Sequence, residues 1–407
     1  MKISQKRWFQ LHGWCSLPLW LIFTAVCITG TIAVLSHELT WLFNENARAL
    51  NPNNLAPKPV AELVNAVLLA EPTAAVSSVL VMEPYLVTAV IFTTETMPTA
   101  IAYVNPYTGV VQEINAGITF ISFIRSLHGW LLFPWQHSYS IGYYLVSAMS
   151  VFMLGALITG LVIYKRFWQS FTAPKLRLHQ GKKTILADLH RLVGVWSLWF
   201  LLLMSLTGLW YLTQAILWHN DVTFYHEVEP LPTLAVPAAG NGQVPAMIPL
   251  AQAVAAAQQY LPQLQLASVS MPEHPRDFYR ISGSGDSIWF DPYSYSVWIN
   301  PWTGAVADSR VPSQMGGLET MMSVADPLHY GTIGGLWTKA IWFLFGLLVS
   351  GMAISGFMIW GSRTLRAARP VSRHTENAAA ELADDSEPTS YVNAPAKMPL
   401  PQRGAKA

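Results

Sequence analysis

The sequence predicts an α-helical membrane protein with four transmembrane helices, internally duplicated, and two small α+β domains outside the bilayer. The first observation behind this prediction is composition. Of 407 residues, 52% are hydrophobic and only 12% are charged, about half the charged share of an average soluble domain. The second is that four long segments contain no charged residue, and the third is that the motifs around them occur twice.

The charge-free segments lie between Arg7 and Glu38, Arg125 and Lys165, Arg191 and Asp221, and Lys339 and Arg363. Each is longer than the about 20 residues that an α-helix needs to cross the hydrocarbon core. We therefore expect transmembrane helices at 14–36, 141–164, 192–216 and 337–360. A cleaved signal peptide is the alternative for the first segment, but its apolar stretch exceeds the about 7–15 residues of a signal-peptide core. We expect a retained helix.

The basic residues predict the orientation. Segments 1–13 and 165–191 hold three and seven Lys or Arg against at most one acid, whereas 38–125 and 221–338 are mainly acidic. Because cytoplasmic loops collect Lys and Arg, both termini should be cytoplasmic and both large loops translocated. In a bacterium this means the inner membrane and the periplasm. The polar tail 363–407 is expected to be disordered.

These boundaries give eight expected regions. They are the first transmembrane helix with its cytoplasmic N-terminus (1–43), an α+β domain (44–120), an interfacial segment with the second helix (121–164), a basic cytoplasmic loop (165–191), the third helix (192–218), a second α+β domain (219–325), an interfacial segment with the fourth helix (326–362), and the tail (363–407).

The motifs of the first half recur in the same order in the second. LHGW at 11–14 matches LHRL at 189–192, and a Thr-Gly pair follows each at the same distance. The turn sequences NPYTG (105–109) and NPWTG (300–304) are each followed by a Leu-His pair, and ITG (158–160) matches ISG (354–356). Ordered recurrence of this kind indicates a duplicated unit.

Four of the 11 histidines stand at equivalent points of the duplicated unit: His12, His128, His190 and His329. Two imidazoles on facing helices can bind one haem iron axially, which gives an electron-transfer haem. We expect His12 with His190 near the cytoplasmic face and His128 with His329 near the periplasmic face, holding two non-covalent haem b groups. His37 is the best substitute ligand. The alternative is that these histidines simply lie among interfacial aromatic residues.

Other features set limits on the chemistry. The small residues Gly30, Gly160, Gly208 and Gly356 suit either close helix packing or the space a porphyrin requires. Nucleotide-binding, covalent haem and zinc-protease motifs are missing, so a quinol or a cytoplasmic reductase would have to supply electrons. A net charge of +1 predicts no nucleic-acid partner. No catalytic residue is assigned.

The paired LHGW/LHRL openings, the NPxTG turns and the ITG/ISG closings resemble the PepSY-associated transmembrane family, over residues 5 to about 362. This resemblance implies iron-regulated inner-membrane proteins with PepSY-like periplasmic domains, and a likeness to FoxB-like siderophore reductases. It implies an oxidoreductase that reduces a ferric siderophore, or another periplasmic ferric substrate, with His12, His128, His190 and His329 as the family-type histidines.

The sequence is also compatible with two other functions. The chain can be a non-enzymatic, membrane-anchored PepSY sensor, binding or regulatory module in which the histidines are structural. A transporter is the third alternative, because repeats also build transport paths, but four spans are few and none carries an acidic residue in its middle.

Overall fold

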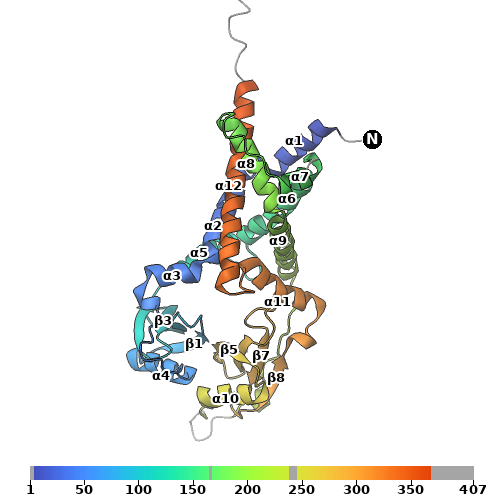
Figure 1. Ribbon diagram of the computed structural model, residues 1–407. Helices are drawn as coiled ribbons and strands as arrows, with labels where there is room; N and C mark the ends of the chain where they lie inside the picture. The colour runs from blue at the N-terminus through green and yellow to red at the C-terminus, as the bar shows by residue number, and fades with distance from the viewer. Residues whose placement is uncertain (1–3, 165–166, 238–244, 368–407) are drawn as a thin grey trace, which may run out of the picture. The chain divides into compact units, whose positions relative to one another are not determined.

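The computed structural model describes residues 4–164, 167–237 and 245–367 (Figure 1). Residues 1–359 form one compact unit, and 360–407 form a second, of which the described part is the end of one helix. The expected disordered tail begins at 363, yet residues 363–367 continue this helix. The rest of the tail, 368–407, lies outside the described residues.

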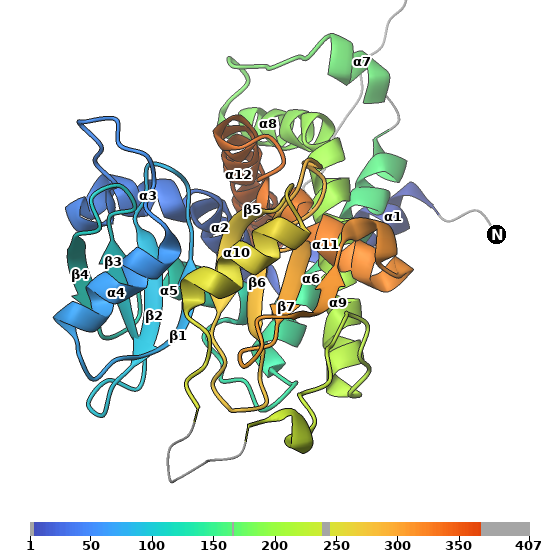
Figure 2. The ribbon, with the colours of Figure 1, turned by 90° about the horizontal axis from the view of Figure 1, so that it is seen from below.

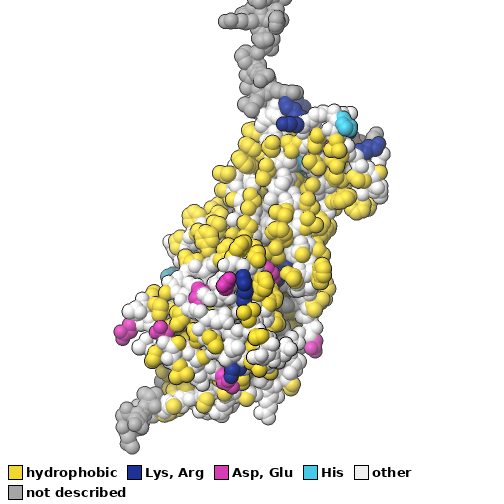
Figure 3. Space-filling view, turned by 60° about the vertical axis from the view of Figure 1, so that its left-hand side comes forward, with side chains coloured by type: hydrophobic (Ala, Val, Ile, Leu, Met, Phe, Trp, Pro, Cys, Tyr) yellow, Lys and Arg dark blue, Asp and Glu magenta, His cyan; other side chains and the backbone are white. Residues whose placement is uncertain are grey.

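Three helices of the described chain are long and apolar enough to cross a membrane. They are α6 (Ile141–Ile163), α9 (Leu198–His219) and residues 336–362 of α12 (Leu336–Ala367). The first and last agree closely with the predicted spans 141–164 and 337–360, and α9 begins six residues later than the predicted 192–216. On the face drawn in Figure 3, hydrophobic side chains cover the helical part, as lipid contact requires.

The predicted first span, 14–36, is a bent pair of helices. Helices α1 (Gln5–Ser16) and α2 (Trp20–Val34) meet at 62° and count as a fourth span only if they cross the membrane together. Pro18 stands in the break, and its missing backbone N–H prevents a continuous helix. The third span is preceded by α8 (Lys182–Trp196), and the single residue Ser197 separates α8 from α9.

The remaining helices are short. Helices α3 (Ser36–Phe43), α5 (Phe120–Trp130), α7 (Phe167–Thr172) and α11 (Gly317–Tyr330) accompany the long ones, and α4 (Val60–Ala70) and α10 (Leu250–Tyr260) belong to the β-sheet domain. Three 3-10 turns lie at Glu45–Ala47, Thr233–Ala235 and Pro312–Gln314.

The β-sheet domain is one antiparallel sheet of eight strands in the order β4-β3-β2-β1-β5-β6-β7-β8. The strands are β1 (Ala75–Leu80), β2 (Thr88–Thr93), β3 (Ala100–Val104), β4 (Val111–Asn115), β5 (Gln265–Ser270), β6 (Tyr279–Ser284), β7 (Tyr295–Ile299) and β8 (Val306–Arg310). Each expected α+β segment supplies one helix and four strands, but the two segments share a sheet because β1 pairs with β5.

The core of this domain lies between the sheet and the helices α4 and α10, which cover the same face (Figure 2). At its centre Val79 of β1 stands opposite Val269 of β5, and both side chains are fully buried. The NPxTG sequences form the predicted tight turns. Gly109 and Gly304 have φ of 76° and 75°, values that favour glycine.

Candidate functional site

The structure brings the four predicted histidines together as two pairs. In the first pair, His12 of α1 and His190 of α8 have ring centres 6.4 Å apart, with the ring planes at 80°. In the second pair, His128 of α5 and His329 of α11 have ring centres 6.2 Å apart, with the planes at 31°. Each partner therefore comes from a different half of the chain.

In the first pair, each imidazole binds the neighbouring apolar helix through Nδ1. His12 Nδ1 lies 3.0 Å from the carbonyl of Ala156 and 3.0 Å from Oγ1 of Thr159, on α6. His190 Nδ1 lies 3.0 Å from Oγ of Ser355, on α12. The Thr159 and Ser355 hydroxyls donate to carbonyls of their own helices, so they accept from the imidazoles.

The second pair repeats this arrangement. His128 Nδ1 lies 3.0 Å from the carbonyl of Val26 on α2. His329 Nδ1 lies 2.8 Å from Oγ1 of Thr207 on α9, and this hydroxyl donates to the carbonyl of Leu203. A carbonyl oxygen can only accept, so Nδ1 carries the proton. This argument fixes His12 and His128 in the tautomer with the lone pair on Nε2, and the Ser355 and Thr207 hydroxyls, which donate to helix carbonyls, favour the same tautomer for His190 and His329.

Two of the four glycines singled out in the sequence, Gly30 and Gly356, make room for an imidazole, and at Gly160 a Cβ would only reach ordinary contact with one. A Cβ atom at Gly30 would lie 2.6 Å from Cε1 of His128, at Gly356 3.2 Å from Cε1 of His190, and at Gly160 3.5 Å from Cε1 of His12. Gly208 faces Ser150 instead. In the Thr29-Gly30 and Ser355-Gly356 motifs the hydroxyl side chain therefore faces Nδ1 of a histidine and the glycine leaves space for its ring.

This donor set fits a haem iron. Two imidazoles that bind one iron at about 2 Å from opposite sides place their ring centres about 6 Å apart, as both pairs do. Histidine ligands of metals almost always donate their other ring N–H to a fixed acceptor. Within the described ranges there is no cluster of three or more His, Cys, Asp or Glu side chains arranged to bind a metal ion. A bis-histidine haem requires only two protein ligands, because the porphyrin supplies the others.

Polar groups border the second pair. The Tyr211 ring centre lies 5.0 Å from that of His329, and the Tyr211 hydroxyl donates to Asp326 at 2.9 Å. Burial raises the pKa of the Asp326 carboxyl to about 6, and the Tyr211 hydrogen bond opposes this. A largely buried carboxyl one turn from His329 was not predicted from the sequence.

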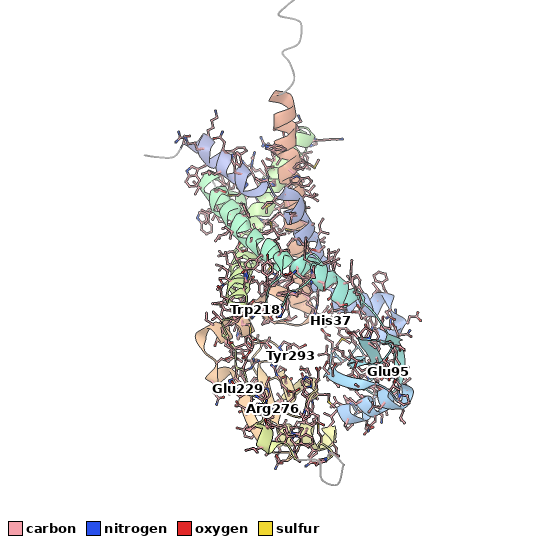
Figure 4. All side chains as sticks on the ribbon, turned by 180° about the vertical axis from the view of Figure 1, so that it is seen from behind. His37, Glu95, Trp218, Glu229, Arg276 and Tyr293 are labelled. Carbon is pink, nitrogen blue, oxygen red and sulfur yellow. The ribbon has the colours of Figure 1, made fainter. Side chains whose placement is uncertain are left out.

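His37, the predicted substitute ligand, is engaged elsewhere (labelled in Figure 4). Arg125 donates to its Nε2 at 3.1 Å, and its Nδ1 lies 2.7 Å from Glu83. Both ring nitrogens are therefore occupied, and the structure does not place His37 in either pair.

The same network contains a buried ammonium group. The Lys339 Nζ atom lies 2.8 Å from Glu38 and 2.9 Å from Glu83, and the lysine is only 6% exposed. Burial alone would raise the pKa of Glu83, but His37 and Lys339 bring it well below its usual range. In the sequence Lys339 served only to mark the start of an apolar segment, and no local pattern indicated its carboxylate partners.

These features define an integral membrane protein with two imidazole pairs held against its apolar helices and an antiparallel β-sheet domain. The family model for the PepSY-associated TM region matches residues 9–363, and the chain belongs to this family. No curated protein matches the chain.

Proposed function

We propose that this protein is a di-haem electron-transfer protein of the bacterial inner membrane. In this proposal it passes electrons across the bilayer and reduces a ferric substrate in the periplasm, a ferric siderophore in iron uptake. The observation that carries the proposal is the twofold occurrence of an imidazole pair with ring centres 6.2–6.4 Å apart and every Nδ1 hydrogen-bonded.

The proposed arrangement is a duplicated four-span bundle with cytoplasmic termini and PepSY-like periplasmic domains. Two features support it. Val79 and Val269, which pair at the centre of the sheet, occupy the same position in β1 and β5, as expected if two copies of one unit meet about a twofold axis. The basic segments 1–13 and 165–191 are separated from the acidic loops by the apolar helices.

The four histidines would hold two haem b groups, which supply one-electron chemistry when bound. The chain's own contribution is positional. Thr159, Thr207 and Ser355 favour one imidazole tautomer, as does the Val26 carbonyl. Placing one pair toward each face divides the crossing of the membrane into shorter electron transfers. A quinol or a cytoplasmic reductase is the proposed donor.

Reduction suits the release of iron from a siderophore. Siderophores offer hard oxygen ligands, to which Fe(III) binds far more strongly than the softer Fe(II). A single electron delivered to the bound iron therefore weakens the complex without breaking a covalent bond. This chemistry requires only a one-electron carrier near the substrate.

The test is the haem content of the full chain, purified in detergent from haem-replete cells. We expect about two haems per chain and a Soret band that shifts on reduction with dithionite. His12→Ala and His329→Ala should each remove about one haem. His219→Ala is the control, because His219 contacts Tyr144 and Tyr139 and belongs to neither pair.

A colourless preparation would contradict the proposal and favour a PepSY binding or regulatory module with structural histidines. Unchanged absorbance in both His12→Ala and His329→Ala would show that the ligands are other residues.

A further inference from the structure

A cavity of about 550 Å³ opens on the second half of the β-sheet domain. Its walls include Trp218 at the end of α9, Met322 of α11, and the loop with His226. Its lining on the sheet side includes Arg280, Trp298 and Arg310. This volume is within the range of small-molecule sites. Trp218 and Glu229, another lining residue, are labelled in Figure 4.

The cavity has a floor on the sheet side, formed by Arg280, Trp298 and Arg310, and a rim that includes the exposed Glu227 and Glu229. Its charged side chains are divided between the two. Glu227 and Glu229 line it but are exposed, whereas Arg310 is 7% exposed. Arg310 is neutralised by Glu319, at 3.4 Å, and His226 lies 3.0 Å from Asp308. Water screens exposed charges more strongly than buried ones, so the floor, not the rim, determines which charge is attracted.

Arg280 is the other cation of the floor, and the charged groups that act on its guanidinium are Arg310, which lowers its pKa, and Asp291, which raises it, while burial lowers it most. No ion pair of Arg280 is present among the described residues, and its buried Nε has no hydrogen-bond acceptor there. The guanidinium lies over the Trp298 ring, with Cζ 5.3 Å from the ring centre. A buried donor without an acceptor is costly, and an anionic oxygen of a ligand would supply one.

The first half of the sheet has no such feature at the corresponding position. Ala89 stands opposite Tyr103 in the β2–β3 pair, as Arg280 stands opposite Trp298 in the β6–β7 pair. Ala89 is buried in an apolar cluster with Leu86, Val87 and Tyr103. The same strand position is therefore packed in one half, and in the other it holds an arginine beside a cavity, so sheet stability does not require an arginine there.

The cavity lies close to the second histidine pair. Met322 and His329 are on one face of α11, two turns apart, which corresponds to about 10 Å along the helix. Trp218 is on α9, the helix whose Thr207 holds His329. Aromatic contacts continue from Trp218 to Trp135 at 6.4 Å and from Trp135 to Trp130 at 5.9 Å, two residues after His128.

We propose that this cavity is the substrate site, and that it binds a ferric chelate which keeps a free carboxylate, with that carboxylate on Arg280 and the chelate against Trp298 and Trp218. This inference rests on the proposed function. The bound Fe(III) takes up one electron from a reduced haem at the second pair and becomes Fe(II), while the haem iron is oxidised by one electron. No proton or covalent bond is transferred.

The test separates binding from electron transfer by using a redox-inert probe. Gallium(III)–diethylenetriaminepentaacetate keeps carboxylates free, because six-coordinate Ga(III) takes only six of the ligand's eight donor atoms. It cannot be reduced under these conditions, so its affinity for the full chain in detergent, measured by calorimetry, does not depend on haem. We expect Arg280→Ala to weaken its binding at least tenfold and Arg280→Lys to weaken it less, with haem content unchanged. Lys58→Ala, which removes an exposed positive charge from the other half of the sheet, should bind as the wild type does.

Three outcomes would overturn the site: no binding of gallium(III)–diethylenetriaminepentaacetate to the wild type, equal binding by wild type and Arg280→Ala, or equally strong binding of the neutral gallium(III) tris-acetohydroxamate. Thermal unfolding of each variant shows whether the change is confined to the cavity. A haem-free protein that still binds the probe through Arg280 would refute the proposed function and leave the site intact.

Discussion

Thr207 Oγ1 lies 2.8 Å from Nδ1 of His329, and since the threonine hydroxyl donates to the carbonyl of Leu203, its oxygen is free to accept a hydrogen bond from that nitrogen. The contact joins α9 to α11 and favours the tautomer of His329 with the lone pair on Nε2. An equivalent hydroxyl contact to Nδ1 occurs at Thr159 with His12 and at Ser355 with His190.

Thr207→Val should therefore weaken haem binding at the second pair. The substitution keeps the shape of the side chain but leaves the Nδ1–H of His329 without its acceptor, and loss of such a partner typically costs about 10–100-fold in metal affinity. The measurement is haem retained per chain during titration with a haem-scavenging apoprotein. Thr213→Val is the matched control, because Thr213 is exposed on α9 and its hydroxyl donates to the carbonyl of Leu209. Equal retention by the two variants would refute this role of Thr207.

Gly30→Ala should displace His128. The new Cβ would lie 2.6 Å from Cε1 of an imidazole held by the Val26 carbonyl, and overpacking of this kind costs about 1–3 kcal/mol. We expect the loss of about one haem per chain and a lower unfolding temperature. In Gly351→Ala the added methyl meets nothing within 4 Å, so this variant should keep its haem and its stability. If Gly30→Ala behaves the same way, the glycine is not needed to seat the ring.

The sequence was sufficient to predict the long apolar helices, the tight NPxTG turns and which histidines lie together in pairs, because each depends on a pattern visible in the chain. Hydrophobic length predicts a span wherever it occurs, and the motif order relates His12 to His190 and His128 to His329. The bend between α1 and α2 was missed because Pro18 was counted within an apolar stretch.

What the sequence could not predict depends on contacts between distant segments. Lys339 is bound by carboxylates about 300 and 256 positions away, and nothing near Glu38 or Glu83 indicates this. The joining of the two α+β segments through β1 and β5 depends on strand edges that no residue pattern marks. The Thr-Gly and Ser-Gly motifs were visible, but their role required knowing that each faces an imidazole of another helix.

Lys339→Met should destabilise the protein. It removes the ammonium group between Glu38 and Glu83 and leaves two partly buried carboxylates facing each other, and breaking a buried pair in this way costs about 3–5 kcal/mol. The measurement is thermal unfolding in detergent. Adding Glu83→Gln to Lys339→Met should recover part of the loss, since one uncompensated charge is removed. A double variant less stable than Lys339→Met would contradict this explanation.

Glu83 should also make stability depend on pH. Although burial opposes it, His37 and Lys339 hold the pKa of Glu83 below its ordinary value of 4.5. The folded state therefore favours the ionised carboxylate, so its contribution is present above about pH 4.5 and is lost as the pH falls below that value. Glu83→Gln should flatten the fall of the unfolding temperature between about pH 5 and pH 3. Glu95→Gln, at an exposed turn, should not. Equal slopes in both variants would contradict the assignment to Glu83.

The two pairs should give different electron paramagnetic resonance signals if each holds a ferric haem. The imidazole planes are at 80° in the first pair and at 31° in the second. Nearly perpendicular planes leave two of the iron d orbitals close in energy, which gives a strongly axial low-spin signal, whereas planes closer to parallel separate them and give a rhombic signal. We expect both signals in the oxidised wild type. His12→Ala should remove the axial signal and His329→Ala the rhombic one. The reverse assignment, or one signal lost in both variants, would show that the ligands are not paired as His12 with His190 and His128 with His329.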